Sequence, residues 1–253
     1  PRRTFVFNNG SDGAVTSAWV QGIAEAVARG WNAVTFDGPG QSSTLVRKHL
    51  GFRADWEHVI TPVVDQLVAR ADVGASRLAL LGVSQGGYWV PRSLAFEHRF
   101  AAAVADPGVV DVSTTLMSHL SHGMHKLLDE GDQAKFDRDM ATGERFSKKL
   151  RATTALRFRP YQQDSAFDVY RTAQAMALTD ELIGQITTPL LITSPEGEQF
   201  WPGQSQSLYD RLSGTKALLE FTDAEGAGSH CEPVGNLVRN QRIFDWLDDQ
   251  IPA

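Results

Sequence analysis

The chain is predicted to fold as an α/β protein, with a mostly parallel sheet covered by helices on both faces. Three observations predict this class. Short apolar runs alternate with longer segments whose apolar residues recur at helical spacing. Strands that alternate with helices pair in parallel, because each crossover helix returns the chain to the same end of the sheet. The 253 residues, of which 42% are hydrophobic, are enough for one sizeable core.

The first half of the chain supplies four of the expected strands, each a short apolar run typical of a buried parallel strand. These strands are expected at 4–7, 31–36, 78–83 and 101–105. Helices are expected at 14–28, at 56–70 and directly after Ser84. In the first of these helices Trp19, Ile23 and Val27 share one face, and Gly30 follows the last turn as a stop signal.

The pattern changes between residues 112 and 186. This stretch is rich in charges and helix formers and poor in strand signals. Alternation then resumes, with strands expected at 190–193 and 216–221 and helices at 204–212 and 236–247. We therefore predict a core made of residues 1–111 and 187–253, with a helical cap, residues 112–186, inserted after the fourth strand.

Residues Gly82-Val83-Ser84-Gln85-Gly86 form the most informative motif of the chain. They match G-x-S-x-G, the nucleophile elbow, in which a serine stands on a sharp turn from a strand into a helix. An apolar run precedes the motif and a helical pattern follows it, which a chance match would not require. Ser84 is therefore predicted to be a nucleophile.

A serine nucleophile needs a base to take its proton and an acid to orient that base. After such an elbow the chain order is serine, acid, histidine. His230 lies in a loop between the last strand and the last helix, which makes it the predicted base. Glu198, after the strand at 190–193, is the preferred acid, and Glu196 in the same loop and Asp106 after the fourth strand are the alternatives.

A tetrahedral intermediate also needs hydrogen-bond donors for its oxyanion. The backbone N–H of Gln85, the residue after the nucleophile, is the first predicted donor. The second is expected in the loop after the first strand, near Gly10-Ser11-Asp12. An ordinary turn that caps the next helix is the alternative for this loop, and the two interpretations are compatible.

Several function classes are not expected. A formal charge of -6 without a long run of one sign argues against a nucleic-acid partner. The chain has no basic amphipathic stretch and no apolar run near the roughly 20 residues of a membrane span, so no membrane partner is expected. The expected partner is a small-molecule substrate, and a homodimer is left open.

No cofactor and no metal are expected. His119, His122 and His125 are three residues apart and lack the i,i+4 pairing of a zinc helix. Cys231 is the single cysteine, so no intrachain disulfide forms, and we interpret it as a small packed side chain. A cytoplasmic location is expected. The chain starts without an initiator methionine or a signal peptide, so residues upstream are expected to be missing. Export is left open because a signal peptide would be missing with them.

The elbow with its flanking strand and helix, the serine–acid–histidine order and the inserted segment together resemble the α/β-hydrolase family over most of the chain. Within that family four motifs look like the FrsA-like esterase group, which includes a carbon–carbon bond hydrolase of nicotine breakdown. The motifs are Asn9-Gly10-Ser11-Asp12-Gly13, Asp37-Gly38-Pro39-Gly40-Gln41, Phe200-Trp201-Pro202 and Gly228-Ser229-His230. The elbow followed by Gly87-Tyr88 is also similar to that of prolyl-oligopeptidase-type serine peptidases.

The resemblance also implies residue roles. The family's acid usually stands four residues before a proline, so Pro202 indicates Glu198, although many relatives have Asp there. Its oxyanion loop usually reads His-Gly where this chain has Asn9-Gly10, which implies the N–H of Ser11 as the second donor. The family sheet has two strands before this loop, which implies that those strands, and a second lid element, lie upstream of residue 1.

The expected activity is that of a carboxylesterase-like serine hydrolase, which cleaves an ester-type bond of a small organic substrate through an acyl-enzyme. A carbon–carbon bond (β-diketone) hydrolase or a prolyl-oligopeptidase-like peptidase with the same triad are the alternatives. A non-catalytic binding module on the same fold is the rival from another class.

Overall fold

Six parallel strands form the single sheet of the protein. The computed structural model describes residues 1–253. The strands follow the order β2-β1-β3-β4-β5-β6, and every neighbouring pair is parallel. Their bounds are β1 (Arg2–Asn8), β2 (Asn32–Phe36), β3 (Val73–Val83), β4 (Phe100–Asp106), β5 (Leu190–Pro195) and β6 (Lys216–Phe221). The predicted α/β class and mostly parallel sheet are confirmed.

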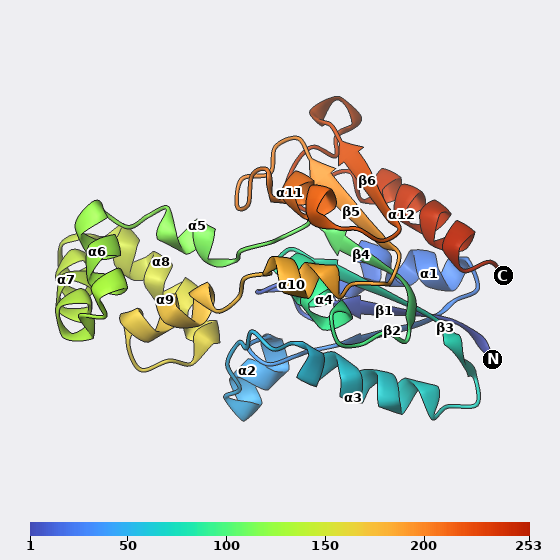
Figure 1. Cartoon of the computed structure of the whole chain (residues 1–253), viewed down its shortest axis with the longest axis horizontal. Helices are drawn as coiled ribbons and strands as arrows, with labels where there is room; N and C mark the ends of the chain where they lie inside the picture. The colour runs from blue at the N-terminus through green and yellow to red at the C-terminus, as the bar shows by residue number, and fades with distance from the viewer.

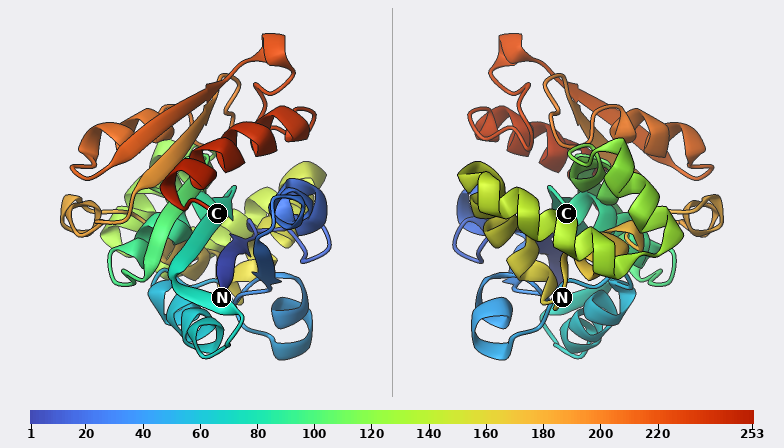
Figure 2. Two further views of the ribbon diagram at one scale, coloured as in Figure 1. Left: turned by 90° about the vertical axis from the view of Figure 1, so that its right-hand side faces the viewer. Right: turned by 90° about the vertical axis from the view of Figure 1, so that its left-hand side faces the viewer.

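Helices cover both faces of this sheet (Figures 1 and 2). One face packs against α3 (Glu57–Val68), α4 (Gly86–Leu94) and α11 (Gln204–Arg211), and the other against η1 (Trp19–Ile23), α1 (Ala24–Ala28) and α12 (Asn236–Gln250). Successive side chains of a strand point to opposite faces of the sheet. Val6 packs in the apolar core on the α3 and α4 face, whereas Phe5 and Phe7 pack in the core on the α1 and α12 face. Burial on both faces explains why the strands are continuous apolar runs.

The segment at 14–28 differs from the predicted helix. Residues 14–17 form no helix, and at Gly22 the backbone leaves the helical conformation with φ 155°. Trp19 and Val27 are 57% and 52% exposed and face outward, whereas Ile23 is partly buried against the core. The small residues Gly22 and Ala26 are buried instead, and a Cβ on Gly22 would lie 3.3 Å from the Phe5 ring. Small residues face the sheet here because the aromatic side chains of β1 already fill the space.

Six helices lie between β4 and β5, where the sequence predicts a cap. Their bounds are α5 (Ser113–Met117), α6 (His122–Glu130), α7 (Gln133–Phe146), α8 (Lys148–Phe158), α9 (Ala166–Gln174) and α10 (Asp180–Gly184). Figure 1 shows α6, α7, α8 and α9 gathered beyond one end of the sheet. They surround their own apolar cluster, which includes Leu128, Phe136 and Tyr170. The role of this segment as a cap stays a prediction.

The remaining elements are short. They are α2 (Ser42–Lys48), which the sequence analysis did not predict, η2 (Arg159–Tyr161) and η3 (Asp223–Glu225). None of the helices has both the length and the apolar character needed to cross a bilayer.

The orientation of the segment Trp19–Ala28, with Gly22 toward the sheet and Trp19 toward solvent, can be tested by two single substitutions. Gly22→Ala should lower the free energy of unfolding by about 1–3 kcal/mol, because an L-residue is strained at this φ and its Cβ would press on the Phe5 ring. Trp19→Ala should change it by about 0.5 kcal/mol or less, because that side chain is exposed. Urea unfolding measures both, and a larger loss for Trp19→Ala would contradict this orientation.

Candidate active site

Ser84 stands on a strained turn between β3 and α4. Its φ is 58°, in the left-handed region that few non-glycine residues adopt. The turn closes because Gly82 has no side chain: a Cβ there would lie 2.2 Å from the carbonyl oxygen of Gly86. In addition, the Ser84 N–H donates to the Asp106 carbonyl oxygen at 2.6 Å. The motif therefore forms the sharp elbow that the sequence predicts. The turn holds the serine at the carboxyl end of β3, in the middle of the sheet.

The carboxyl ends of the strands bring the loops that follow β5 and β6 toward this serine. Asn8 of β1 is paired with Gly82, and Asp106 of β4 is paired with Val83. A further parallel bridge joins Gly197 to Ser229, in the loops that follow β5 and β6. Glu198 and His230 are the next residues after that bridge, so the sheet edge brings both loops to the elbow.

The structure brings together the three residues of the preferred triad. His230 Nε2 lies 2.9 Å from Ser84 Oγ, and His230 Nδ1 lies 2.6 Å from Glu198 Oε2. The side chains of His230 and Glu198 are 13% and 6% exposed. This is the geometry that general-base activation of a serine requires.

Glu198 is held as a carboxylate. Burial by itself raises the pKa of its carboxyl, but the hydrogen bond and charge of His230 and the N–H groups of Trp201 and Phe200 outweigh burial, so the net pKa is lowered. Those two N–H groups donate to Oε1 at 3.1 and 2.7 Å, which leaves Oε2 for His230. Both oxygens of the carboxylate are therefore satisfied.

The alternative acids lie elsewhere. Glu196 is exposed, and its carboxylate accepts a hydrogen bond from the Asp223 N–H at 3.0 Å. Asp106 is fully buried, and its carboxylate accepts from Thr193 Oγ1 and Arg239 Nε, both at 2.6 Å. Neither carboxylate contacts His230, so Glu198 is the acid that the geometry favours.

Both predicted oxyanion donors have a backbone N–H without a partner in the protein. Neither the Gln85 N–H nor the Ser11 N–H donates a hydrogen bond within the protein. Gly10 packs directly on Ser84, because a Cβ there would lie 2.7 Å from Ser84 Cβ and 3.3 Å from Ser84 Oγ. The loop after β1 therefore reaches the serine without an intervening side chain.

A buried charged cluster supports the histidine loop, and the sequence analysis missed it. Arg239 of α12 is fully buried and donates to Asp106, the Gln21 carbonyl and the Asn240 side chain. Glu232, two residues after His230, is also fully buried, with Oε2 3.3 Å from Arg239 Nε. Burial, and then the charge of Asp106, raise the pKa of Glu232 well above its ordinary value, against the opposing charge of Arg239.

Residues 113–184 touch the site at several points. Gln85 Nε2 donates to Met176 Sδ at 3.6 Å, and the Arg157 guanidinium carbon lies 5.8 Å from the centre of the Phe200 ring. Phe200 in turn meets the His230 ring edge-on, with 4.7 Å between ring centres. The helical segment and the triad are thus linked through Phe200 and Gln85.

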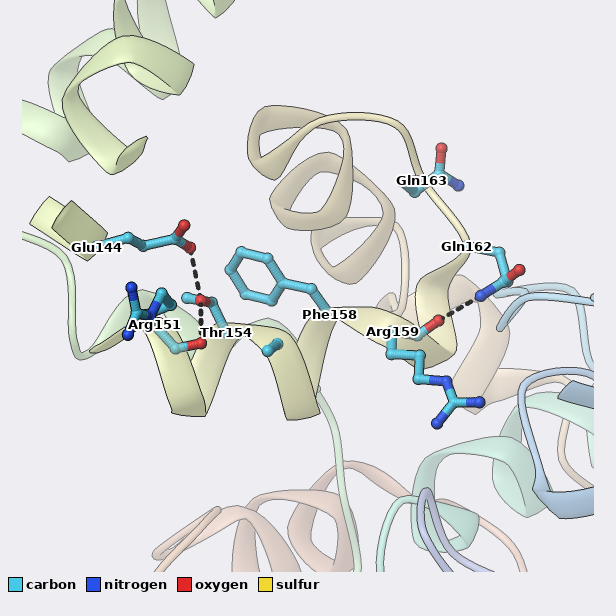
Figure 3. A pocket seen from close by; sticks show the side chains of 8 residues that line it. Glu144, Arg151, Thr154, Phe158, Arg159, Gln162 and Gln163 are labelled. Atoms are coloured by element: carbon cyan, nitrogen blue, oxygen red, sulfur yellow. Dashed lines mark hydrogen bonds between the residues drawn. The ribbon is translucent and has the colours of Figure 1, made fainter. Parts of the chain in front are cut away.

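A separate cavity of about 290 Å³ lies within the helical segment (Figure 3). Its polar lining includes Glu144, which accepts a hydrogen bond from Thr154 at 2.5 Å, together with Arg151 and Arg159. None of its lining residues belongs to the triad or the two candidate oxyanion donors.

The remaining candidates of the sequence analysis lie outside the triad. His119, His122 and His125 lie in or just before α6, and no group of three His, Cys, Asp or Glu side chains is gathered for a metal ion. Cys231 lies with Sγ 3.6 Å from the Asp106 carbonyl oxygen, and burial raises the pKa of its thiol.

Known proteins resemble this chain in sequence. The prolyl oligopeptidase family matches residues 58–158, a range that includes the elbow. The hydrolase LUC6 of Fusarium sp is 28% identical over 96% of this chain and 61% of its own length. The 20-hydroxy-prefusarin hydrolase FUS2 of Gibberella moniliformis is 26% identical over 94% of this chain and 60% of its own length. The chain thus spans about three fifths of the length of these curated relatives.

A solved structure extends the likeness to the whole chain. The 2,6-dihydroxy-pseudo-oxynicotine hydrolase covers 100% of this chain, which covers 61% of that protein, with a TM-score of 0.72 at 19% sequence identity. The α/β hydrolase GrgF from Penicillium sp. sh18 covers 99% of this chain, which covers 90% of that protein, with a TM-score of 0.68 at 15% identity. Together with the parallel six-stranded sheet, this likeness shows that the chain has the α/β-hydrolase fold. Membership of the FrsA-like group stays a prediction.

The raised pKa of Glu232 predicts a pH-dependent stability. The native state keeps its proton above the ordinary carboxyl pKa of 4.5, whereas the unfolded state releases it. The stability that the native state gains from its higher Glu232 pKa is fully present below pH 4.5 and is lost as pH rises toward the native-state pKa. Glu232→Gln removes that titration, so the variant should gain stability relative to the wild type as pH rises from 5 to 8. Urea unfolding across this range measures the difference, and parallel profiles would contradict it.

Proposed function

We propose that this chain carries the catalytic site of a serine hydrolase that cleaves an ester-type bond of a small organic substrate through an acyl-enzyme. The observation that carries the proposal is the continuous hydrogen-bonded chain from Ser84 through His230 to Glu198. Fungal relatives whose names describe hydrolases support the same class of activity.

The first half of the proposed reaction forms the acyl-enzyme. His230 Nε2 accepts the hydroxyl proton while Ser84 Oγ bonds to the substrate carbonyl carbon. The carbonyl oxygen becomes an oxyanion, which the N–H groups of Gln85 and Ser11 bind. The bond to the leaving oxygen then breaks, and that oxygen takes the proton from His230 and departs as an alcohol.

The second half repeats these steps with water. Water gives a proton to His230 and bonds to the acyl carbon, and the returning proton releases Ser84 and a carboxylic acid. Glu198 stays ionised throughout, in keeping with its lowered pKa, and stabilises the positive imidazolium.

Residues 112–186 are proposed to cap this site and select the substrate. Their contacts with Gln85 and Phe200 support this, because both residues adjoin the triad. A carbon–carbon bond or peptide hydrolase would use the same triad and differ only in the leaving group. Ester, β-diketone and amide substrates assayed side by side distinguish the three activities.

Ser84→Ala should abolish labelling by a fluorophosphonate probe and lower any hydrolysis by about 10³-fold or more, because the variant has no nucleophile. Ser207→Ala, at an exposed serine of α11, is the matched control and should label like the wild type. In-gel fluorescence of the labelled chain measures both. Labelling that survives in Ser84→Ala would overturn the proposal, and an unlabelled wild type would favour the binding-module alternative.

Glu198→Gln and Glu196→Gln compare the two acids of one loop. Glu198→Gln should lower kcat by about 10²–10⁴-fold with little change in KM, because the amide cannot stabilise the imidazolium. Glu196→Gln should retain wild-type kinetics, because its carboxylate bonds only to the Asp223 N–H. The reverse order of effects in steady-state assays would reassign the acid.

A further inference from the structure

Gln41 is a buried side chain to which neither the motif analysis nor the triad gives a role. It precedes α2, and its side chain is fully buried. Both ends of its amide are bonded: Oε1 accepts the Gly38 N–H at 2.7 Å, and Nε2 donates to the carbonyl oxygens of Asn9 and Gly10, each at 2.7 Å. An amide nitrogen has two hydrogens, so these bonds use its full donor capacity.

The two carbonyls held by Gln41 belong to the loop beside the nucleophile. In a trans peptide unit the C=O and the following N–H point in opposite directions. A bond that holds the Gly10 carbonyl toward Gln41 therefore turns the Ser11 N–H away from Gln41. The bond to the Asn9 carbonyl fixes the adjoining peptide unit in the same way.

The free side of this loop faces the serine. Gly10 packs on Ser84 Cβ with no room for a side chain, and the Ser11 N–H has no partner within the protein. The loop is further tied at its start, where Asn8 Nδ2 also donates to the Asn9 carbonyl at 2.9 Å and Asn8 Oδ1 accepts from Trp56 Nε1 at 2.8 Å. Rigid anchoring on one side and an unpaired donor on the other is the arrangement of a preorganised oxyanion site.

We propose that Gln41 is a positioning residue for the oxyanion site: by holding the carbonyls of Asn9 and Gly10, it aims the Ser11 N–H at the oxyanion formed on Ser84. This inference rests on the proposed function, because it assigns a task within that reaction. Gln41 itself touches neither substrate nor nucleophile, and it acts only through the orientation of two peptide units.

Gln41→Glu isolates the donor role. The carboxylate keeps the shape and the acceptor for the Gly38 N–H, but it places an oxygen against two carbonyl oxygens. We expect the fluorophosphonate labelling rate to fall by about 10–10²-fold, somewhat less than the loss of a whole oxyanion donor. With p-nitrophenyl acetate, kcat should fall while KM changes little, and the pH profile of labelling should keep its wild-type midpoint.

Two further variants keep the test informative. Gln41→Met removes the donors without adding a charge, so it replaces Gln41→Glu if that variant does not show a cooperative thermal transition. Thr44→Val is the matched control, because Thr44 donates to the carbonyls of Gly38 and Gln41 in the same turn and does not contact Asn9 or Gly10. It should label like the wild type.

The outcomes separate this inference from the proposed function. If the wild type labels at Ser84 and a folded Gln41 variant labels equally fast, the positioning role is overturned and the hydrolase proposal stands. The positioning role is also overturned if a folded Gln41 variant raises KM without lowering kcat. If the wild type does not label, or Ser84→Ala still labels, both proposals fall together.

Discussion

The position of Asp106 at the end of β4 is the constraint on which the rest of the site depends. Its carbonyl oxygen accepts the Ser84 N–H, and its carboxylate accepts from Thr193 of β5 and Arg239 of α12. One buried residue thus joins the elbow, two neighbouring strands and the last helix. Asp106 and Arg239 are both fully buried, and losing one partner of such a pair costs roughly 3–5 kcal/mol in general. Ser84 is therefore tied directly to the buried core.

The same cluster extends to the histidine loop. Cys231 and Glu232 have φ values of 58° and 47°, so the chain directly after His230 is held in a conformation that costs energy. Glu232 lies in the buried cluster beside Arg239, which keeps this strained turn in place. The strained backbone and the buried charged residues thus lie directly beside His230, whose ring contacts both Ser84 and Glu198.

Sequence reasoning predicted Ser84 from a turn that needs glycine, and His230 and Glu198 from their places after the last two strands. The structure brings these three side chains within hydrogen-bond distance of one another. Sequence reasoning gave Gln41 no role and missed Arg239, because their contacts are with residues 31 and 133 positions away along the chain, which no local pattern reveals. The face of the first helix was misjudged for a similar reason: apolar spacing does not show that the rings of β1 favour the small residues Gly22 and Ala26 over Trp19 and Val27.

In the proposed hydrolase, the sheet and the helical segment have separate tasks. Any acyl-transfer reaction needs the serine, the imidazole and two fixed donors, and in this chain all of these are held by the sheet edge and its buried hydrogen bonds. The helices between β4 and β5 pack around their own apolar cluster and meet the site through Gln85 and Phe200. The three triad residues themselves lie outside this helical segment, in the loops that follow β3, β5 and β6. Under this proposal the core determines the reaction type, and the helical segment determines the choice among ester, carbon–carbon and peptide bonds by how it presents the leaving group to His230.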